Sequence, residues 1–181
     1  MNARALVVAG LSLALPLAWA SGCQPGMSTT PAVAPVPQRA FGLPLYLAPE
    51  PSVLSVDDPE GRPIALTLQH AVRDVLEEAG FKLVATPADA AGVTASVVIQ
   101  RVGIIHADLF IHGGEACGVR LDVVRGDTVL ASARPEVDCL STSAYYGMLP
   151  KDAAVALVNK ISQAPALLSV AEALRSPSPP P

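Results

Sequence analysis

The sequence is poor in aromatic residues and has no run of basic residues. Phe, Trp and Tyr make up 4% of the chain, and its one tryptophan, Trp19, stands in an apolar first segment. After Cys23 the chain carries 11 Lys and Arg residues against 16 Asp and Glu residues. Binding of nucleic acid begins with a positive surface, so this charge pattern argues against nucleic acid as a partner. It also argues against a polybasic helix lying on a membrane.

The sequence also lacks the motifs of catalytic sites. It has no G-x-S-x-G, no lysine at S-x-x-K spacing and no repeated acidic calcium loop. A nucleophile, a base and oxyanion donors are not grouped anywhere in the sequence. We therefore expect no catalytic residues, no cofactor and no metal, and we interpret the chain as a protein that is not an enzyme.

The first 22 residues have the pattern of a secretion signal. Arg4 supplies a short positive start, and thirteen mostly apolar residues, 5–17, follow it. Thirteen residues are too few to span a membrane as a helix, and they match the apolar core of a signal peptide. We therefore expect residues 1–22 to be removed and the mature chain to be exported.

A single cysteine follows this segment in the stretch A-S-G-C, residues 20–23. The stretch resembles the bacterial lipobox, which implies cleavage before Cys23 and attachment of lipid to that residue, although Ala20 stands where leucine is usual. An ordinary signal site, A-W-A at 18–20, is the alternative and places the cut after Ala20. Gln24 in place of aspartate resembles the sorting signal for the outer membrane, so we expect a lipid-anchored protein that faces the periplasm.

The count of cysteines supports the lipid anchor. If Cys23 carries lipid, Cys117 and Cys139 remain as an even pair for the oxidising compartment that a signal peptide implies. We predict a disulfide between Cys117 and Cys139. With G-D at 126–127 as a hairpin turn, Cys117 falls opposite Glu136, so a bulge or a loose strand end has to bring the sulfurs together. Two free thiols in a redox or metal site are the alternative, but no C-x-x-C spacing supports it.

Composition divides the chain into four segments. The signal peptide, residues 1–22, precedes Cys23 and a proline-rich linker, residues 23–40 in all, that favours an extended polyproline conformation. At about 3.1 Å per residue, the linker places a domain up to roughly 50 Å from the lipid. We expect residues 41–175 to form a single domain and residues 176–181, SPSPPP, to form a disordered tail.

Hydrophobic periodicity predicts the elements of this domain. Apolar residues at helical spacing predict helices at 64–79, 150–161 and 165–174, the first ended by Gly80. Alternating apolar residues predict strands at 41–47, 81–85, 92–105 and, as a hairpin, 117–137. Pro44 places the first strand at an edge or a bulge, and the acidic stretch 57–63 is expected to be a loop. This order predicts an α+β fold, with a mixed, largely antiparallel sheet of four to six strands and two or three helices on one face.

The same order resembles a group of small envelope lipoproteins. The quoted stretches AVRDVLEEAGFKLV and ADAAGVTASVVIQRV are similar in pattern to the lipopolysaccharide-assembly lipoprotein, the lipoprotein activators of penicillin-binding proteins and the N-terminal domain of the Tol–Pal periplasmic protein. The resemblance spans residues 41–162 in pattern. It implies this fold and an envelope location, and it names no particular partner.

Two stretches hold candidate site residues. In HADLFIHGGEAC the potential metal ligands are His106, Asp108, His112, Glu115 and Cys117. On one continuous strand the two histidines would be about 20 Å apart, and the chain would have to fold back at G-G, 113–114, to join them. A polar strand face and a turn are therefore the preferred interpretation, and we expect no metal site.

The second stretch, STSAYYGMLP at 141–150, gathers Tyr145, Tyr146 and Met148 in a protein that is otherwise poor in aromatics. Exposed Tyr and Met are favoured at protein interfaces, so these three residues are the candidates for binding a partner. Packing of this loop onto the last helix is the alternative.

These observations favour a non-catalytic outer-membrane lipoprotein whose periplasmic domain binds or scaffolds a partner in envelope assembly. A carrier or receptor for an apolar ligand, such as a lipid or glycolipid, is the alternative. The alternative predicts a concave apolar pocket between the sheet and the helices.

Overall fold

The computed structural model describes residues 42–106, 112–143 and 147–175, and these residues form an eight-stranded sheet with three α-helices. The strands are β1 (Pro44–Leu47), β2 (Ser52–Val56), β3 (Lys82–Leu83), β4 (Val93–His106), β5 (His112–Cys117), β6 (Arg120–Arg125), β7 (Thr128–Ala133) and β8 (Cys139–Ser141). The helices are α1 (Arg62–Glu78), α2 (Pro150–Ser162) and α3 (Pro165–Arg175), with a short 3₁₀ helix, η1 (Pro59–Gly61), before α1. The predicted α+β class is confirmed, and the sheet has more strands than the four to six that were expected.

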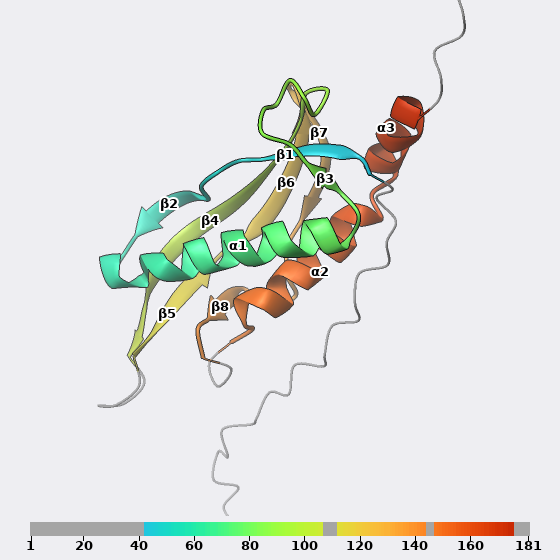
Figure 1. Cartoon of the computed structure of the whole chain (residues 1–181). Coiled ribbons are helices and arrows are strands. Elements are labelled where there is room, and N and C mark those ends of the chain that lie inside the picture. Colours follow the sequence, from blue (N-terminus) through green and yellow to red (C-terminus); the bar gives the residue numbers. More distant parts are fainter. Residues whose placement is uncertain (1–41, 107–111, 144–146, 176–181) are drawn as a thin grey trace, which may run out of the picture.

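The long strand β4 organises the whole sheet (Figure 1). Its first half pairs with β1 on one side and β6 on the other, and its second half pairs with β2 and β5 in the same way. The pairings of β1 and β2 with β4 are parallel, whereas β4, β5, β6, β7 and β8 pair antiparallel to one another. The predicted mixed, largely antiparallel sheet is therefore present.

Strands β5 and β6 are two parts of one extended run that breaks at Gly118. Cys117 lies opposite Arg101 and Arg120 lies opposite Val98, so the register against β4 is the same on both sides of the break. Gly118 has a φ of 63°, and a Cβ atom there would overlap the side chain of Gln100. Only glycine fits this bend, because it alone adopts the left-handed region without a side-chain clash.

The hairpin between β6 and β7 has the predicted two-residue turn. Arg125 pairs with Thr128 across Gly126 and Asp127, and Gly126 has a φ of 56°. A register shift follows at Val123 and Val124, so the later pairs of this hairpin are displaced by one residue. Such a bulge is a common device for bending a strand.

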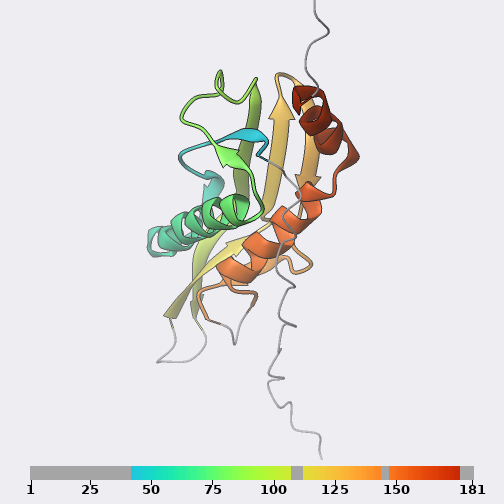
Figure 2. The same ribbon diagram turned by 45° about the vertical axis from the view of Figure 1, so that its right-hand side comes forward.

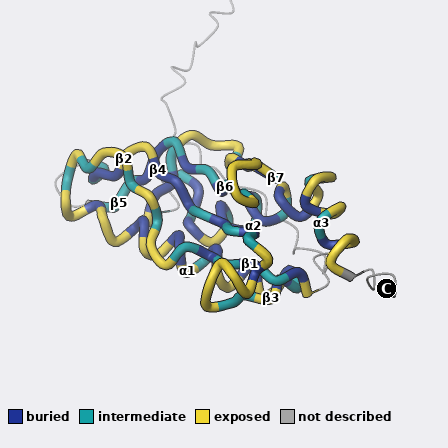
Figure 3. The backbone as a smooth tube through the Cα atoms, turned by 90° about the horizontal axis from the view of Figure 1, so that it is seen from above, coloured by how far each residue is buried: buried dark blue, intermediate teal, exposed yellow. Residues whose placement is uncertain are grey.

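The helices cover one face of the sheet and enclose the core (Figure 2). Helices α1 and α2 lie side by side against the sheet, and α3 reaches β7 at the end of the molecule. Buried residues follow the central strands and the inner sides of the helices, while β2 is exposed or half-buried along its length (Figure 3). The largest fully buried apolar side chains in this core are Leu45, Ile64, Leu68, Leu76, Ile99, Leu121, Leu140, Leu157 and Ile161.

Helix α1 ends where its sequence predicted. Gly80 has a φ of 85°, and the N–H of Phe81 donates to the carbonyl of Leu76 at 3.1 Å. The N–H of Gly80 donates to the carbonyl of Glu77 at 3.0 Å. This pair of bonds is a Schellman motif, which satisfies carbonyls at the end of the helix and turns the chain into β3.

The expected edge position of the first strand is wrong. β1 lies between β3 and β4 and pairs with both in parallel. Pro44 is tolerated there because it is the first residue of the strand, a position that proline occupies without breaking a ladder.

The start of α1 approaches the sheet very closely. An added Cβ atom on buried Gly61 would overlap the backbone of Gly103 in β4. On the neighbouring strand, a Cβ atom on Gly114 would lie 3.3 Å from the Cβ of Ile64. Glycines on both layers therefore let η1 and α1 rest directly on the strands.

Within the described residues, no single helix has both the length and the apolar character to cross a membrane. Helices α2 and α3 reach that length and composition only as a pair, and a bend of 67° separates them.

Candidate functional site

The disulfide between Cys117 and Cys139 is formed, as its sequence context predicted. It joins β5 to β8, where Cys117 and Cys139 lie directly opposite each other with their Cα atoms 4.0 Å apart. The neighbouring Gly118 N–H donates to the Asp138 carbonyl at 2.9 Å, so the cysteines occupy a position that is not itself hydrogen-bonded. Opposite residues approach most closely at such positions, and this closeness allows the bridge.

The sulfurs meet in the way that the sequence required, through a bulge and a segment that leaves the strand. Extending the β6–β7 hairpin placed Glu136 opposite Cys117. In the structure β7 ends at Ala133, and β8 begins a new pairing with β5 at Cys139. The bulge at Val123 and Val124 shifts the register by one residue, and residues 134–138, which lie outside the strands, add the rest of the shift that brings the cysteines opposite each other.

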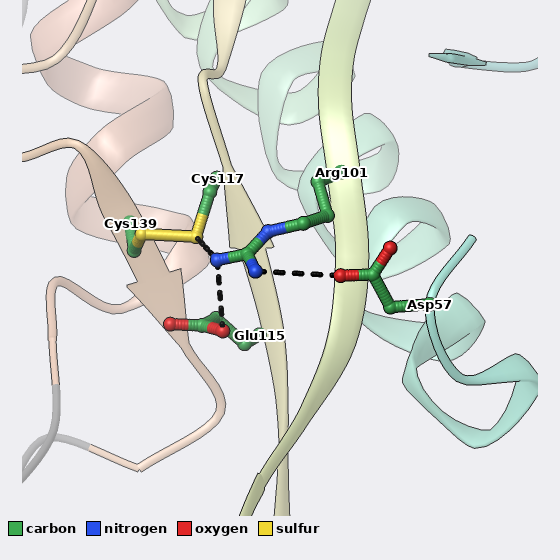
Figure 4. Close-up of a disulfide and its surroundings, with 5 residues drawn as sticks. All are labelled: Asp57, Arg101, Glu115, Cys117 and Cys139. Carbon is green, nitrogen blue, oxygen red and sulfur yellow. Dashed lines mark hydrogen bonds and ion pairs between the residues drawn. A yellow bond between two sulfur atoms is a disulfide. The ribbon is translucent and has the colours of Figure 1, made fainter. Parts of the chain in front are cut away.

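A cluster of charged side chains surrounds the disulfide on the face of the sheet opposite the helices (Figure 4). Arg101 of β4 donates from Nη2 to Sγ of Cys117 at 3.3 Å, and the same nitrogen lies 3.7 Å from Oε2 of Glu115. Its Nη1 lies 3.3 Å from Oδ2 of Asp57, in the loop that follows β2. The guanidinium of Arg101, which belongs to β4, thus contacts the loop after β2, strand β5 and the disulfide.

This cluster is a surface feature with a modest energy. The side chains of Arg101 and Asp57 are 50% and 48% exposed. Exposed ion pairs contribute about 0–1 kcal/mol each because water screens the charges. The cluster therefore orients the loop after β2 more than it stabilises the fold.

Three atoms that could bind a metal lie close together beside Arg101. These are a carboxylate oxygen of Glu115 and the sulfurs of Cys117 and Cys139, all within 4.8 Å of one another. Both sulfurs belong to the disulfide, so neither is available as a thiolate, and the Arg101 guanidinium adds a positive charge beside them. The cluster in this oxidised form is not a metal centre.

The geometry expected for His106 and His112 is wrong. The G-G pair, 113–114, lies within β5 and is not a turn, and β5 pairs antiparallel to β4 so that the two histidines are direct register partners. They are therefore neighbours instead of lying far apart along one strand. Asp108 lies outside the described residues.

Of the three residues expected to bind a partner, Met148 is the one that the structure describes. Met148 is 5% exposed and belongs to the core, where it pairs with Leu140 in an isolated bridge. The Ser141 N–H donates to its carbonyl at 3.0 Å. Met148 is thus buried and not exposed for a partner, and its bridge is to β8 and not to the last helix, while Tyr145 and Tyr146 lie outside the described residues.

A surface that sequence reasoning missed lies along β2. The stretch SVLSV had no predicted structure, yet it forms a strand that pairs only with β4 among the described elements. Between this strand and α1 lies a groove of about 390 Å³, lined by Glu50, Pro51, Val53, Val56, Arg62, Ala65 and Leu66. Leu54 of β2 and Leu66 of α1 are 67% and 50% exposed. The only signal in the sequence was the β-branched valines between Pro51 and Asp57.

No protein-family model matches the chain, and no curated protein matches it. Solved structures with a related outline include the PelC dodecamer from Paraburkholderia phytofirmans, at 11% identity and a TM-score of 0.42 over 67% of this chain and 86% of PelC. The lipoprotein GNA1162 from Neisseria meningitidis is 14% identical, with a TM-score of 0.36 over 54% of this chain and 80% of its own. A DUF330 family protein from Xanthomonas campestris is 17% identical, with a TM-score of 0.35 over 78% of this chain and 88% of its own. At these TM-scores the similarities carry no argument about activity, partner or location.

Proposed function

We propose that the chain is a non-catalytic lipoprotein of the outer membrane, anchored through Cys23, whose domain faces the periplasm and binds or scaffolds a partner in envelope assembly. The observation that carries this proposal is the disulfide. It pairs Cys117 with Cys139 and leaves Cys23, in its A-S-G-C context, as the third cysteine. A formed disulfide also suits an oxidising compartment outside the cytosol.

The anchor would act by restricting where the domain can be. Acyl chains at Cys23 hold the protein on a surface, and the proline-rich linker sets the distance that the domain reaches from it. A partner in the same membrane then meets the domain at a raised effective concentration, without any additional contact.

Phase partition of the full chain produced in a bacterium tests the anchor. The unaltered protein is expected in the detergent phase of Triton X-114, and the Cys23→Ala variant in the aqueous phase. The matched control changes Cys117 and Cys139 to Ala together, which removes two sulfurs but leaves the anchor, so this variant stays in the detergent phase. A mature chain that begins at Ser21 and carries no acyl group, as read by intact mass, would overturn the proposal.

A receptor for an apolar ligand such as a lipid or glycolipid is a second candidate function. Among the described residues, side chains such as Leu68, Ile99 and Leu121 fill the layer between sheet and helices. The groove between β2 and α1, lined in part by valines, is the observation that favours such a ligand. Native mass spectrometry of the purified protein tests it, because a retained lipid appears as a mass increment that the Val53→Asp variant loses.

A further inference from the structure

The outer edge of β2 presents unpaired backbone groups. Asp57, just after the strand, donates its N–H to the carbonyl of Val102 in β4 at 2.9 Å. Successive N–H groups of a strand point to opposite sides, so those of Val56 and Leu54 point away from β4. In the part of the chain that the structure describes, no strand pairs with that side. A free edge of this kind is a template for one more strand.

Apolar side chains flank this edge above and below. The groove beside it is lined by Val53, Val56 and Leu66 on the side of α1. Leu54 is 67% exposed. A strand added at this edge would cover the groove with one set of its alternating side chains. Backbone hydrogen bonds and side-chain pockets together are what strand addition uses for recognition.

The charges at the two ends of β2 argue against a second copy as the occupant. Glu50 is exposed just before the strand, and Asp58 and Glu60 follow it. Asp57 is paired with Arg101, and within residues 50–62 the one basic residue is Arg62. Two copies of β2 paired antiparallel about Leu54 would bring the acidic start of each against the acidic end of the other. Like charges facing each other across a strand pair are destabilising.

We propose that the free edge of β2 binds an extended segment of a partner protein by strand addition, and that this segment is apolar at alternate positions with a basic residue near each end. This inference rests on the proposed role in binding a partner and identifies the surface that does so. Glu50 and Asp58 are eight residues apart, so the two basic residues are expected about 26 Å apart in an extended chain.

Two synthetic peptides test the chemistry of the segment. One nine-residue peptide has valine and threonine alternating between terminal lysines, and the other has terminal glutamates in place of the lysines. Fluorescence anisotropy with the full mature chain in detergent is expected to show the lysine peptide binding about tenfold more tightly, because each end exchanges a repulsive pair for an attractive one. Equal binding of both peptides, or binding of neither, would overturn the proposal.

Charge reversal on the protein locates the binding. The double variant Glu50→Lys and Glu60→Lys should prefer the glutamate peptide, since both ends of the edge change sign. The matched control, Glu78→Lys with Glu136→Lys, alters net charge equally at exposed positions away from β2 and should keep the lysine preference. Asp58 is left unchanged because its Oδ1 accepts the Glu60 N–H at 2.9 Å and caps η1. A preference that does not reverse in the first variant contradicts binding at this edge.

Hydrogen exchange gives a readout that identifies the backbone involved. Binding of the lysine peptide should slow exchange of the Leu54 and Val56 amides, which face the free edge. Strand addition is contradicted if the peptide slows amide exchange elsewhere but not in β2. It is also contradicted if the protein dimerises through this edge without peptide, or if a co-purified lipid displaces the peptide. Peptide binding does not depend on acyl chains at Cys23. A failure of the peptide to bind would therefore overturn strand addition without contradicting the lipid anchor. Absence of the anchor would likewise not contradict strand addition.

Discussion

At the scale of single residues, Gly61 is where the helical layer comes closest to the sheet. A Cβ atom added there would overlap the Gly103 backbone, and backbone cannot move aside as a flexible side chain does. Overpacking at such a point costs about 1–3 kcal/mol, so Gly61→Ala is expected to lower the free energy of unfolding by about 3 kcal/mol. Urea titration followed by circular dichroism measures the change.

The matched control for this prediction is on the other side of the same contact. A Cβ atom on Gly103 would lie 3.6 Å from the Cβ of Asp57, an ordinary van der Waals distance. Gly103→Ala should therefore change stability by less than about 1 kcal/mol. Equal losses in the two variants would show that the close approach at Gly61 is not what makes glycine necessary.

The disulfide gives a second prediction at this scale. Cys117 and Cys139 are 22 residues apart in sequence, and closing a loop of this size stabilises a fold by about 3 kcal/mol. The double variant Cys117→Ala, Cys139→Ala should lose about that amount in urea titration. A reducing agent should lower the midpoint of the unaltered protein and leave that of the double variant unchanged. If the reducing agent leaves the urea midpoint of both proteins unchanged, the prediction is wrong.

At the scale of elements, helix α1 has one buried face and one exposed face, and leucines two positions apart lie on different faces. Leu68 is 0% exposed against the sheet, whereas Leu66 is 50% exposed. Truncating a buried leucine leaves a cavity, so Leu68→Ala is expected to cost about 3 kcal/mol, and Leu66→Ala less than about 0.5 kcal/mol. Thermal unfolding of the two variants measures this difference. Similar losses for both would contradict the packing of α1 described here.

The elements that sequence reasoning found are those with a strong pattern of their own. The periodicity up to Gly80, the β-branched run of β4 and the G-D turn at 126–127 each specified local structure without help from the rest of the chain. Three-residue β8 and serine-rich β2 carry no such pattern, and both exist because they pair with longer neighbours. Strand formation depends on cross-strand packing, which a single segment does not reveal.

The candidate site shows the same limit. The pairing of Cys117 with Cys139 followed from the number of cysteines, whereas the strand that carries Cys139 did not. The arrangement of His106 and His112 depended on where the chain reverses, and Met148 entered the core through a bridge to Leu140. Arg101 carried no signal in the sequence, because its three acceptors come from segments that only the sheet brings together.

At the scale of the whole molecule, one strand, β4, joins the two halves of the sheet. β4 pairs with β1, β2, β5 and β6, and its apolar residues contribute to a single core cluster that extends from Leu43 to Ala171. Because both halves of the sheet share this strand, neither half has a complete core without the other. We expect unfolding in urea to be one cooperative transition.

The composition of the linker predicts that it contributes reach and not stability. Its prolines, with small and polar residues between them, favour an extended chain that buries little apolar surface. A variant that lacks residues 24–38 should therefore unfold at the same urea concentration as the full mature chain, within about 0.5 kcal/mol. A larger loss, measured by circular dichroism, would mean that the deleted segment packs against the domain.

The bridge between β5 and β8 has a consequence for the integrity of the chain. It encloses β6, β7 and the exposed turn at Gly126 and Asp127 within one covalent ring. A protease that cuts this turn would leave a single molecule that migrates intact on a non-reducing gel and separates into two fragments only after reduction. New chain termini, or an inserted tag, can therefore be placed at this turn while both flanking pieces remain joined.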